Sequence, residues 1–284
     1  MRLLHGGADS GAAPVLRRRA GALFAACLSW GLVEAGWPRL RELELDVPGL
    51  PRELDGLRIG HLSDFHLGVP SPGGRAVERG VSWVTERRPD LVAITGDLLT
   101  RPDGEPRLRG LVERLPRPAY AVLGNHDLAI ARDPFARPSE LRELEPARLL
   151  SDAGELLELR GCSIWIAGAD PRSLFRCEVR RDPNSLSREA DLRILLCHFP
   201  RLFDRLEPGR FELVLAGHMH DGQIALPYPG GKVRFAHPTA PYAAGVYRSR
   251  AGVMHVSPGL GTTFVPFRFG ARPEATELVL RSPR

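Results

Sequence analysis

One arrangement recurs five times along this 284-residue chain: a short apolar run leads into a turn that carries aspartate, asparagine or histidine. Short apolar runs bounded by turn residues are typical of buried strands. Side chains that follow the carboxyl ends of such strands meet at one edge of an open α/β sheet. We therefore expect the polar residues of five motifs to form one site: Asp64-Phe65-His66, Gly96-Asp97, Gly124-Asn125-His126-Asp127, Cys197-His198 and Gly217-His218-Met219-His220.

The runs before the first three motifs predict strands at 57–62, 90–95 and 119–123, with helices between them at 75–88 and 108–115. Strands that alternate with helices indicate a parallel α/β core. The polar, proline-bearing residues before the first strand are expected to be a lead-in to the domain (38–51). The rest of the chain predicts one helix and seven strands, namely helix 138–151 and strands 155–159, 163–167, 192–196, 213–216, 245–247, 253–256 and 276–280.

No linker divides residues 41–284, which predicts one domain there, and residues 1–40 are expected to be a separate N-terminal segment. In that segment Arg17-Arg18-Arg19 precede 20–33, a run of 14 residues without charge. Such a run is too short for a membrane span of ~20 residues, but it suits the apolar part of a signal peptide. No good cleavage site follows, so an uncleaved membrane anchor fits equally. The alternative is a buried N-terminal helix.

The chain is basic, with 39 lysine and arginine residues against 34 acidic ones and a pI near 9.4. This balance favours an anionic partner or a membrane surface. The arginines are scattered and are not interleaved with aromatic residues, so no nucleic-acid partner is expected. The four cysteines lack the C-x-x-C spacing of a zinc site. Cys162 and Cys197 lie in apolar runs and are expected to be small core residues.

The polar residues of the five motifs suit a site for two divalent metal ions. A carboxylate offers two oxygens, so Asp97 can bridge two cations. Mixed carboxylate and imidazole ligands suit Mn, Fe, Zn or similar ions. Two such ions about 3.5–4 Å apart activate a water and stabilise an in-line displacement. One metal would be completed by Asp64, His66 and His220, and the other by Asn125, His198 and His218.

His126 directly follows a predicted ligand and is expected to protonate the leaving oxygen. Asp127 is expected to orient that imidazole and to support its charged form. Each motif alone has an ordinary explanation as a turn, but all five in this order indicate a site. The isolated histidines His61, His237 and His255 are expected to be core or surface residues without a ligand role.

With these motifs the chain resembles the calcineurin-like metallophosphoesterase superfamily, over roughly residues 57–280. The resemblance implies a four-layer α/β/β/α sandwich with mixed sheets, a dinuclear metal centre and hydrolysis of phosphoesters. It implies the same ligand positions as those above, and it makes His126 the catalytic histidine.

Segments after the last motif resemble a bacterial branch of membrane-associated or exported phosphodiesterases. Members of that branch begin with a basic, apolar segment, and one related activity cleaves the pyrophosphate of a UDP-diacylglucosamine lipid precursor. Met219 departs from the branch, which usually has threonine there, and so does Asp221, where glycine is usual. Asp221 could tune metal choice or repel a phosphomonoester, but we expect a solvated turn residue. The similar segments are 217–224, 226–227, 242–247, 259–262, 267–270 and 273–274.

The leading prediction is a metal-dependent phosphodiesterase or pyrophosphatase at the membrane, with a lipid-linked substrate such as UDP-diacylglucosamine. Two alternatives stay open: a soluble nucleotide or general phosphodiesterase, and a non-catalytic scaffold, which predicts eroded ligands. Apolar residues in 226–242 and 264–269 could contact acyl chains, but we expect them in the core. The N-terminal segment favours a membrane-associated or exported protein over a cytoplasmic one. The periplasmic side of a bacterial inner membrane is one option, and the segment leaves the side that the domain faces open.

Overall fold

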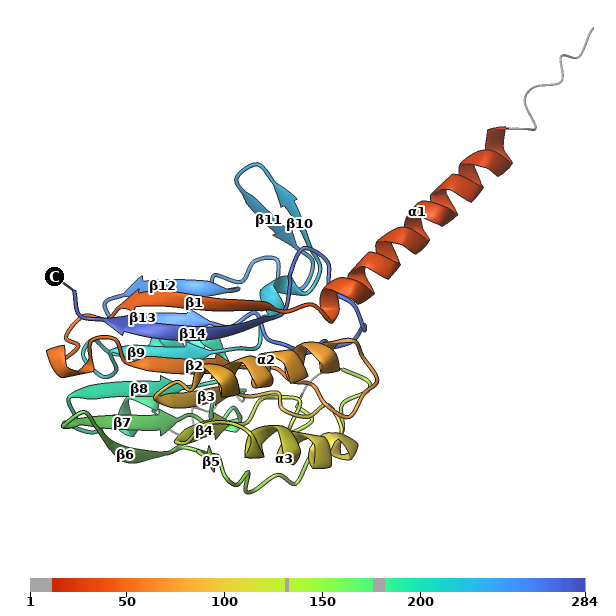
Figure 1. Cartoon of the computed structure of the whole chain (residues 1–284). Helices are drawn as coiled ribbons and strands as arrows, with labels where there is room; N and C mark the ends of the chain where they lie inside the picture. The colour runs from red at the N-terminus through yellow and green to blue at the C-terminus, as the bar shows by residue number, and fades with distance from the viewer. Residues whose placement is uncertain (1–11, 131–132, 176–181, 284) are drawn as a thin grey trace, which may run out of the picture.

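Two six-stranded sheets pack face to face in the computed structural model, which describes residues 12–130, 133–175 and 182–283 (Figure 1). The first sheet consists, in spatial order, of β1 (Arg39–Asp46), β14 (Glu274–Arg281), β2 (Arg58–Leu62), β3 (Leu91–Thr95), β4 (Ala119–Val122) and β5 (Arg148–Leu149). Strands β2 to β5 are parallel, and the parallel arrangement of β2, β3 and β4 was predicted. Strand β14 runs antiparallel to β2, so the sheet is mixed.

The second sheet is also mixed, because its four central strands are parallel and both edge strands are antiparallel to their neighbours. All the strands predicted for this half of the chain are present. In spatial order the sheet consists of β12 (Gly245–Ser249), β13 (Gly252–Val256), β9 (Leu213–Ala216), β8 (Leu192–Leu196), β7 (Cys162–Gly168) and β6 (Ala153–Leu159).

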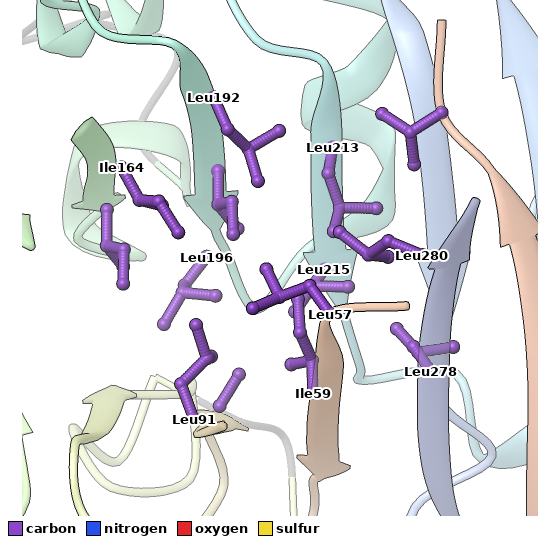
Figure 2. Packing of buried hydrophobic residues seen from close by; sticks show 14 of the residues in the cluster. Leu57, Ile59, Leu91, Ile164, Leu192, Leu196, Leu213, Leu215, Leu278 and Leu280 are labelled. Carbon is purple, nitrogen blue, oxygen red and sulfur yellow. The ribbon is translucent and has the colours of Figure 1, made fainter. Parts of the chain in front are cut away.

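The main core lies between the two sheets (Figure 2). Ile59 and Leu91 of the first sheet lie in one buried cluster with Ile164 and Leu213 of the second. Each fully buried side chain of this size stabilises the fold by about 1.5–3 kcal/mol. The strands are covered on both faces, which explains why they appear in the sequence as apolar runs without alternation.

Helices α2 (Gly73–Arg87) and α3 (Glu105–Glu113) cover the outer face of the first sheet (Figure 1). Both were predicted, and α2 buries valines at helical spacing against that face. The outer face of the second sheet is covered by short 3-10 turns, whose Leu186, Leu202 and Phe203 lie in one buried cluster with residues of the sheet. The only other helix in the described part of this half, α4 (Arg172–Phe175), has four residues. The α/β sandwich with two mixed sheets is confirmed, and its fourth layer is thin. Single 3-10 turns lie at Arg52–Leu54, Pro102–Gly104, Pro183–Leu186, Pro200–Arg205 and His220–Gly222.

Two predicted segments are wrong. Residues 138–151 are not a helix but a loop that ends in β5. Pro146 lies inside the expected helix, where it has no N–H to donate and disfavours the helical region for the preceding residue. The expected lead-in contains β1, which pairs with β14 along its whole length. Leu43 and Leu45, two residues apart, are the only local sign of that strand.

Helix α1 (Ala12–Ala35) projects away from the sandwich (Figure 1). Its last turn packs on the domain, where Glu34 and Ala35 are buried, whereas Phe24 is 70% exposed and Val33 is 56% exposed. The alternative of a buried N-terminal helix is therefore wrong. Among the described residues, no helix has both the length and the apolarity needed to cross a bilayer.

A hairpin of β10 (Ala225–Tyr228) and β11 (Gly231–Arg234) stands apart from both sheets, on the side from which α1 projects (Figure 1). Core positions were expected for apolar residues in this part of the chain. That expectation is wrong for Leu226, Tyr228, Val233, Phe235 and Phe264, which are 44%, 54%, 53%, 61% and 51% exposed.

Candidate metal centre

The five strand-end motifs meet at one edge of the sandwich. The first three follow β2, β3 and β4 of the first sheet, and the last two follow β8 and β9 of the second. The parallel strands of each sheet end on the same side, so the turns after them face each other across the sandwich. The structure brings together all seven residues predicted as metal ligands, and it buries all of them except His218, which is partly exposed.

One cluster contains Asp64, His66 and His220. Nε2 of His66 and Nε2 of His220 are 3.0 Å apart, and Nε2 of His220 is 3.3 Å from Oδ1 of Asp64. Burial lowers the pKa of both histidines, so both imidazoles are neutral near pH 7. Ring nitrogens converging beside a carboxylate form a donor set for a divalent cation.

A second cluster contains Asn125, His198 and His218. Nε2 of His198 is 3.0 Å from Oδ1 of Asn125 and 3.1 Å from Nδ1 of His218. Nδ1 of His198 lies 2.8 Å from the carbonyl oxygen of Thr95, to which it can donate, and this would leave Nε2 to face the cluster. Burial lowers the pKa of His218 to about 3, so its lone pair is also available.

Asp97 lies between the two clusters. One carboxylate oxygen, Oδ2, is 3.5 Å from Nε2 of His66 and 3.2 Å from Nε2 of His198. Burial acts to lower the pKa of His198, but Asp97 overcomes this effect and raises it to about 9. The negative potential that holds a proton on His198 would hold a metal cation for the same reason. The residues present therefore fit two divalent cations that share Asp97.

Several of these ligands lie in turns where their own backbone is in the left-handed region of φ/ψ space. Asp64, His66, Asp97, His218 and His220 have φ angles between 49° and 74°. Such angles cost about 1–3 kcal/mol each for residues other than glycine, and they concentrate at functional sites. The packing of the rest of the sandwich offsets this cost where the ligands converge, and it thereby fixes the backbone conformation of the site.

His126 is next to the shared carboxylate, with Nε2 4.0 Å from Oδ2 of Asp97. The expected contact between Asp127 and this imidazole is not the one observed. Asp127 instead accepts hydrogen bonds from the backbone N–H groups of Leu98, Leu99 and Gly124. It thereby joins the turns after β3 and β4.

Asp133 is the carboxylate that faces His126, and sequence reasoning missed it. Its Oδ2 lies 3.8 Å from Nδ1 of His126 and 3.0 Å from Oγ1 of Thr263. Nε2 of His126 is 3.4 Å from the same hydroxyl. Asp133 lies outside the strand-end motifs, so no local pattern could have identified it.

Arg268 is a second residue that the sequence did not single out. Its guanidinium is fully buried, lies 2.9 Å from Nδ1 of His220, and donates to the carbonyl oxygens of Gly261, Pro258 and Ala271. Burial lowers the pKa of Arg268 to about 10, which leaves it protonated at neutral pH. Arg268 therefore fixes the orientation of one predicted ligand.

Asp221 is not a solvated turn residue, as was expected. It is 7% exposed, and its carboxylate lies 2.6 Å from Nζ of Lys232 and 2.9 Å from Nε of Arg234, both on β11. These two cations neutralise its charge, which argues against the alternative in which Asp221 repels a phosphomonoester. Asp221 instead ties the hairpin to the turn that carries His220.

The three histidines that were given no ligand role lie outside the two clusters. His61 and His255 are fully buried, with their Nδ1 atoms 2.8 Å apart, and Nε2 of His61 is 3.0 Å from Oγ1 of Thr95. His237 is exposed. Cys162 and Cys197 are buried as predicted, and Cys177 lies outside the described residues.

A hollow of about 400 Å³ opens beside His218. Apolar and aromatic side chains form much of its wall, among them Phe199, Met219 and Tyr242, and Arg201 and Arg205 also line it. A pocket of this size can take an organic group larger than a phosphate. The second cluster is therefore accessible to a substituent of a substrate.

Two ligand clusters joined by one carboxylate, with a histidine alongside, are the arrangement of a two-metal hydrolase. The model of the family described as calcineurin-like phosphoesterase matches residues 57–222, and the chain belongs to this family. It is a metal-dependent phosphoesterase, whose buried histidine and aspartate clusters are consistent with the family's dinuclear metal site.

Three relatives illustrate its similarities. The chain is 33% identical over 270 residues to a transmembrane protein with metallophosphoesterase domain from Danio rerio, covering 89% of this chain and 60% of the relative. It is 31% identical over 235 residues to the uncharacterized metallophosphoesterase YkoQ of Bacillus subtilis, covering 80% and 84%. It is 25% identical over 257 residues to the UDP-2,3-diacylglucosamine pyrophosphatase LpxG of Chlamydia trachomatis, covering 73% and 77%.

Proposed function

We propose that the protein is a two-metal phosphodiesterase or pyrophosphatase that acts at a membrane on a lipid-linked substrate. The observation that carries the diester part is the hollow beside His218. A phosphomonoester has one organic group, whereas a diester or pyrophosphate needs room for a second group on the other side of the metals. The hollow offers that room next to the partly exposed ligand of the site.

The chain's own residues would divide the chemistry. Asp64, His66 and His220 would hold one cation, and Asn125, His198 and His218 the other, with Asp97 shared. When bound, the metal pair supplies Lewis acidity and an activated water. His126 would protonate the leaving oxygen, and Asp133 would stabilise the charged imidazole from 3.8 Å away.

The membrane part of the proposal is supported by the exposed apolar side chains of α1 and of the β10–β11 hairpin. The basic residues before the apolar run of α1 suit an anchor or export signal, and we place the domain on the exported side of a bacterial inner membrane. One relative is named for cleaving a lipid-linked pyrophosphate. We therefore propose that the chain belongs to the bacterial branch of membrane-associated or exported phosphodiesterases.

A soluble nucleotide phosphodiesterase is the second candidate. The observation that favours it is the composition of the hollow, in which Phe199 and Tyr242 could stack on a base and Arg201 and Arg205 could meet a second phosphate. A scaffold without catalysis would not need a complete ligand set, and all seven ligand positions are filled.

The test is an assay of metal-stripped protein with Mn, Zn, Mg or Fe added back. Three kinds of substrate are compared: a simple aryl phosphodiester, a nucleotide diester, and a UDP-diacylglucosamine lipid in mixed vesicles. Strong preference for the lipid supports the proposal. Activity on the aryl diester alone, or on nucleotide diesters, supports the second candidate. No activity on any of them with any metal contradicts both.

A further inference from the structure

The β10–β11 hairpin has one apolar face. Leu226 and Val233 are paired across the two strands, and Tyr228 lies two residues beyond Leu226 on the same strand. Alternate residues of a strand share a face, so these three side chains point to one side, and Phe235 continues that side beyond β11. All four are 44% or more exposed. An apolar face on an arm without a core of its own requires a partner.

The opposite face of the hairpin is basic and is fixed in place. Lys232 and Arg234 alternate with Val233, and both meet Asp221 beside the metal centre. Nζ of Lys232 also donates to the carbonyl oxygen of Gly270 over 2.8 Å. The tether holds the hairpin in one orientation, so its apolar face points outward and away from Asp221.

Helix α1 is held by the same loop as the hairpin. The backbone N–H of Arg268 donates to the carbonyl oxygen of Gly31 over 3.0 Å, and the N–H of Ala271 donates to Oε1 of Glu34 over 3.0 Å. The N–H of Ala225, at the base of the hairpin, donates to the carbonyl oxygen of Phe269 over 2.7 Å. The bases of both projections are therefore hydrogen-bonded to residues 268–271, and the projections lie on one side of the molecule (Figure 1).

A hollow of about 640 Å³ lies between the last turn of α1, β1 and β11. Five basic side chains line it against three carboxylates, so the hollow is positive. Lys232 and Arg234 are paired with Asp221. Arg39 and Arg41 are 3.4 and 3.9 Å from the carboxylate of Glu274. Arg272 lies over the ring of Trp37, 4.2 Å from its centroid. Arginine beside exposed tryptophan is typical of the headgroup region of a bilayer.

We propose that these three parts form one docking surface for a bilayer that contains anionic phospholipid. The apolar face of the hairpin and the exposed side chains of α1 would enter the interface, and the basic hollow between them would take lipid phosphates. The positive charge of the hollow favours this occupant over a second copy of the same basic chain. The inference rests on the proposed function at the membrane and extends it by naming the surface.

Docking in this way would bring the metal centre to the lipid headgroups. Nε2 of Gln223, which precedes the hairpin, donates to the carbonyl oxygens of Thr263 and Val265 over 2.7 and 3.1 Å. Phe264, between them, is exposed, and its ring centroid is 6.5 Å from that of His126. The loop beside His126 is thus fixed to the base of the docking hairpin.

The test is co-sedimentation of the full chain with vesicles of phosphatidylcholine alone or with added phosphatidylglycerol. The wild-type chain should bind the mixed vesicles more tightly, and salt should weaken this binding. The double variant Tyr228→Glu, Val233→Glu should bind roughly tenfold more weakly or worse, because it removes two apolar contacts and adds negative charge. The matched control is Leu156→Glu on edge strand β6, where the leucine is 53% exposed, as Val233 is.

A second variant tests the hollow. Arg39→Gln, Arg41→Gln should lose the preference for phosphatidylglycerol, whereas Arg109→Gln, in an exposed ion pair on α3, should keep it. Equal binding by the hairpin variant and the wild-type chain would overturn the docking surface, and so would equal binding to both vesicle types. A dimer measured by light scattering that the hairpin variant abolishes would assign the face to a second copy instead.

An assay on the aryl phosphodiester separates this inference from the proposed function. The hairpin variant should hydrolyse that soluble substrate like the wild-type chain, because its substituted residues touch no metal ligand or His126. A wild-type chain that binds mixed vesicles but hydrolyses only soluble diesters would contradict the lipid-linked substrate and leave the docking surface standing. If the hairpin variant binds vesicles normally and still hydrolyses the lipid, the docking surface is contradicted and the lipid-linked substrate is supported.

Discussion

The metal centre and the docking hairpin begin within a few residues of each other, yet their side chains are held in different ways. At the metal centre, side chains from five turns and both sheets are buried together, and most ligands have at least two neighbours within 3.5 Å. On and just beyond the hairpin, four exposed apolar side chains are held by the strand pairing beneath them, by Asp221, and by hydrogen bonds to the carbonyl oxygens of Phe269 and Gly270.

This difference predicts which region tolerates substitution. A substitution at the metal centre leaves buried polar atoms without partners, which costs free energy. A substitution on the hairpin leaves an exposed surface of different chemistry. The centre should therefore lose function sharply when altered, whereas the hairpin should change its partner and leave the chemistry intact.

The largest effect is expected for Asp97→Ala, because it removes the carboxylate shared by both clusters. Loss of a residue outside the ligand set already costs roughly 10–100-fold in metal affinity, so loss of a shared ligand should exceed about 100-fold in activity. Bound metal and kcat/KM on an aryl diester are the measurements. Asp103→Ala, at an exposed acidic side chain after β3, is the control and should change neither. If the Asp97→Ala variant binds as much metal as the wild-type chain, the expected sensitivity of the metal centre to substitution is contradicted.

His126→Ala should come next, with kcat lowered by about 10²–10⁴-fold and bound metal unchanged. A loss of acid catalysis can be distinguished from a general disruption of the site. A general acid matters most for a poor leaving group, so the loss should be small for a nitrophenyl diester and large for an alkyl one. The same loss on both substrates would show that His126 acts in some other way.

Arg268→Met should weaken metal binding by roughly 10–100-fold, because the guanidinium orients His220 without being a ligand itself. Activity should recover when metal is added in excess, which a mere loss of folding would not allow. Arg272→Met, in the same loop but partly exposed over Trp37, is the matched control for metal affinity. Unchanged metal affinity in Arg268→Met would contradict the positioning role.

The smallest effect is expected for Asp221→Asn, which weakens the tether of the hairpin. Both partner cations are about one third exposed, and pairs of this kind contribute about 1 kcal/mol or less. Hydrogen exchange of the β10–β11 amides should accelerate by about fivefold, while exchange in β8 and β9 stays the same. Faster exchange in all of these strands would show that Asp221 supports the whole metal centre and would remove the distinction between the two regions.

The metal centre was largely predictable from the sequence, because the chemistry of each ligand is local to a strand end. The turns after β2, β3, β4, β8 and β9 each contain a recognisable pair of residue types directly after an apolar run. The parallel strands then bring these turns together without further information. The arrangement of ligands needs only the order of the strands and the side of the sheet on which they end.

What the sequence did not reveal depends on contacts between distant residues. Strand β1 exists because β14 lies beside it, more than 200 residues later in the chain. Asp133 faces the metal centre from a loop that carries no motif. Arg268 lies in a segment that resembles the bacterial branch, but that resemblance did not indicate its contact with His220. The hairpin had a local sign, since Pro229-Gly230 separates two short segments with apolar residues, but its exposure could not be read from composition. Asp221 was misjudged because its partners lie on that hairpin.

Lys232 is the only lysine of the chain, and it lies on β11 in the docking hairpin. An amine-reactive fluorophore would therefore label this position and the terminal amine alone. Because Nζ is held by Asp221 and by the carbonyl oxygen of Gly270, the labelling rate reports how often the hairpin releases its tether. The labelling rate of this one side chain thus measures the motion of the hairpin in the full chain, without any substitution.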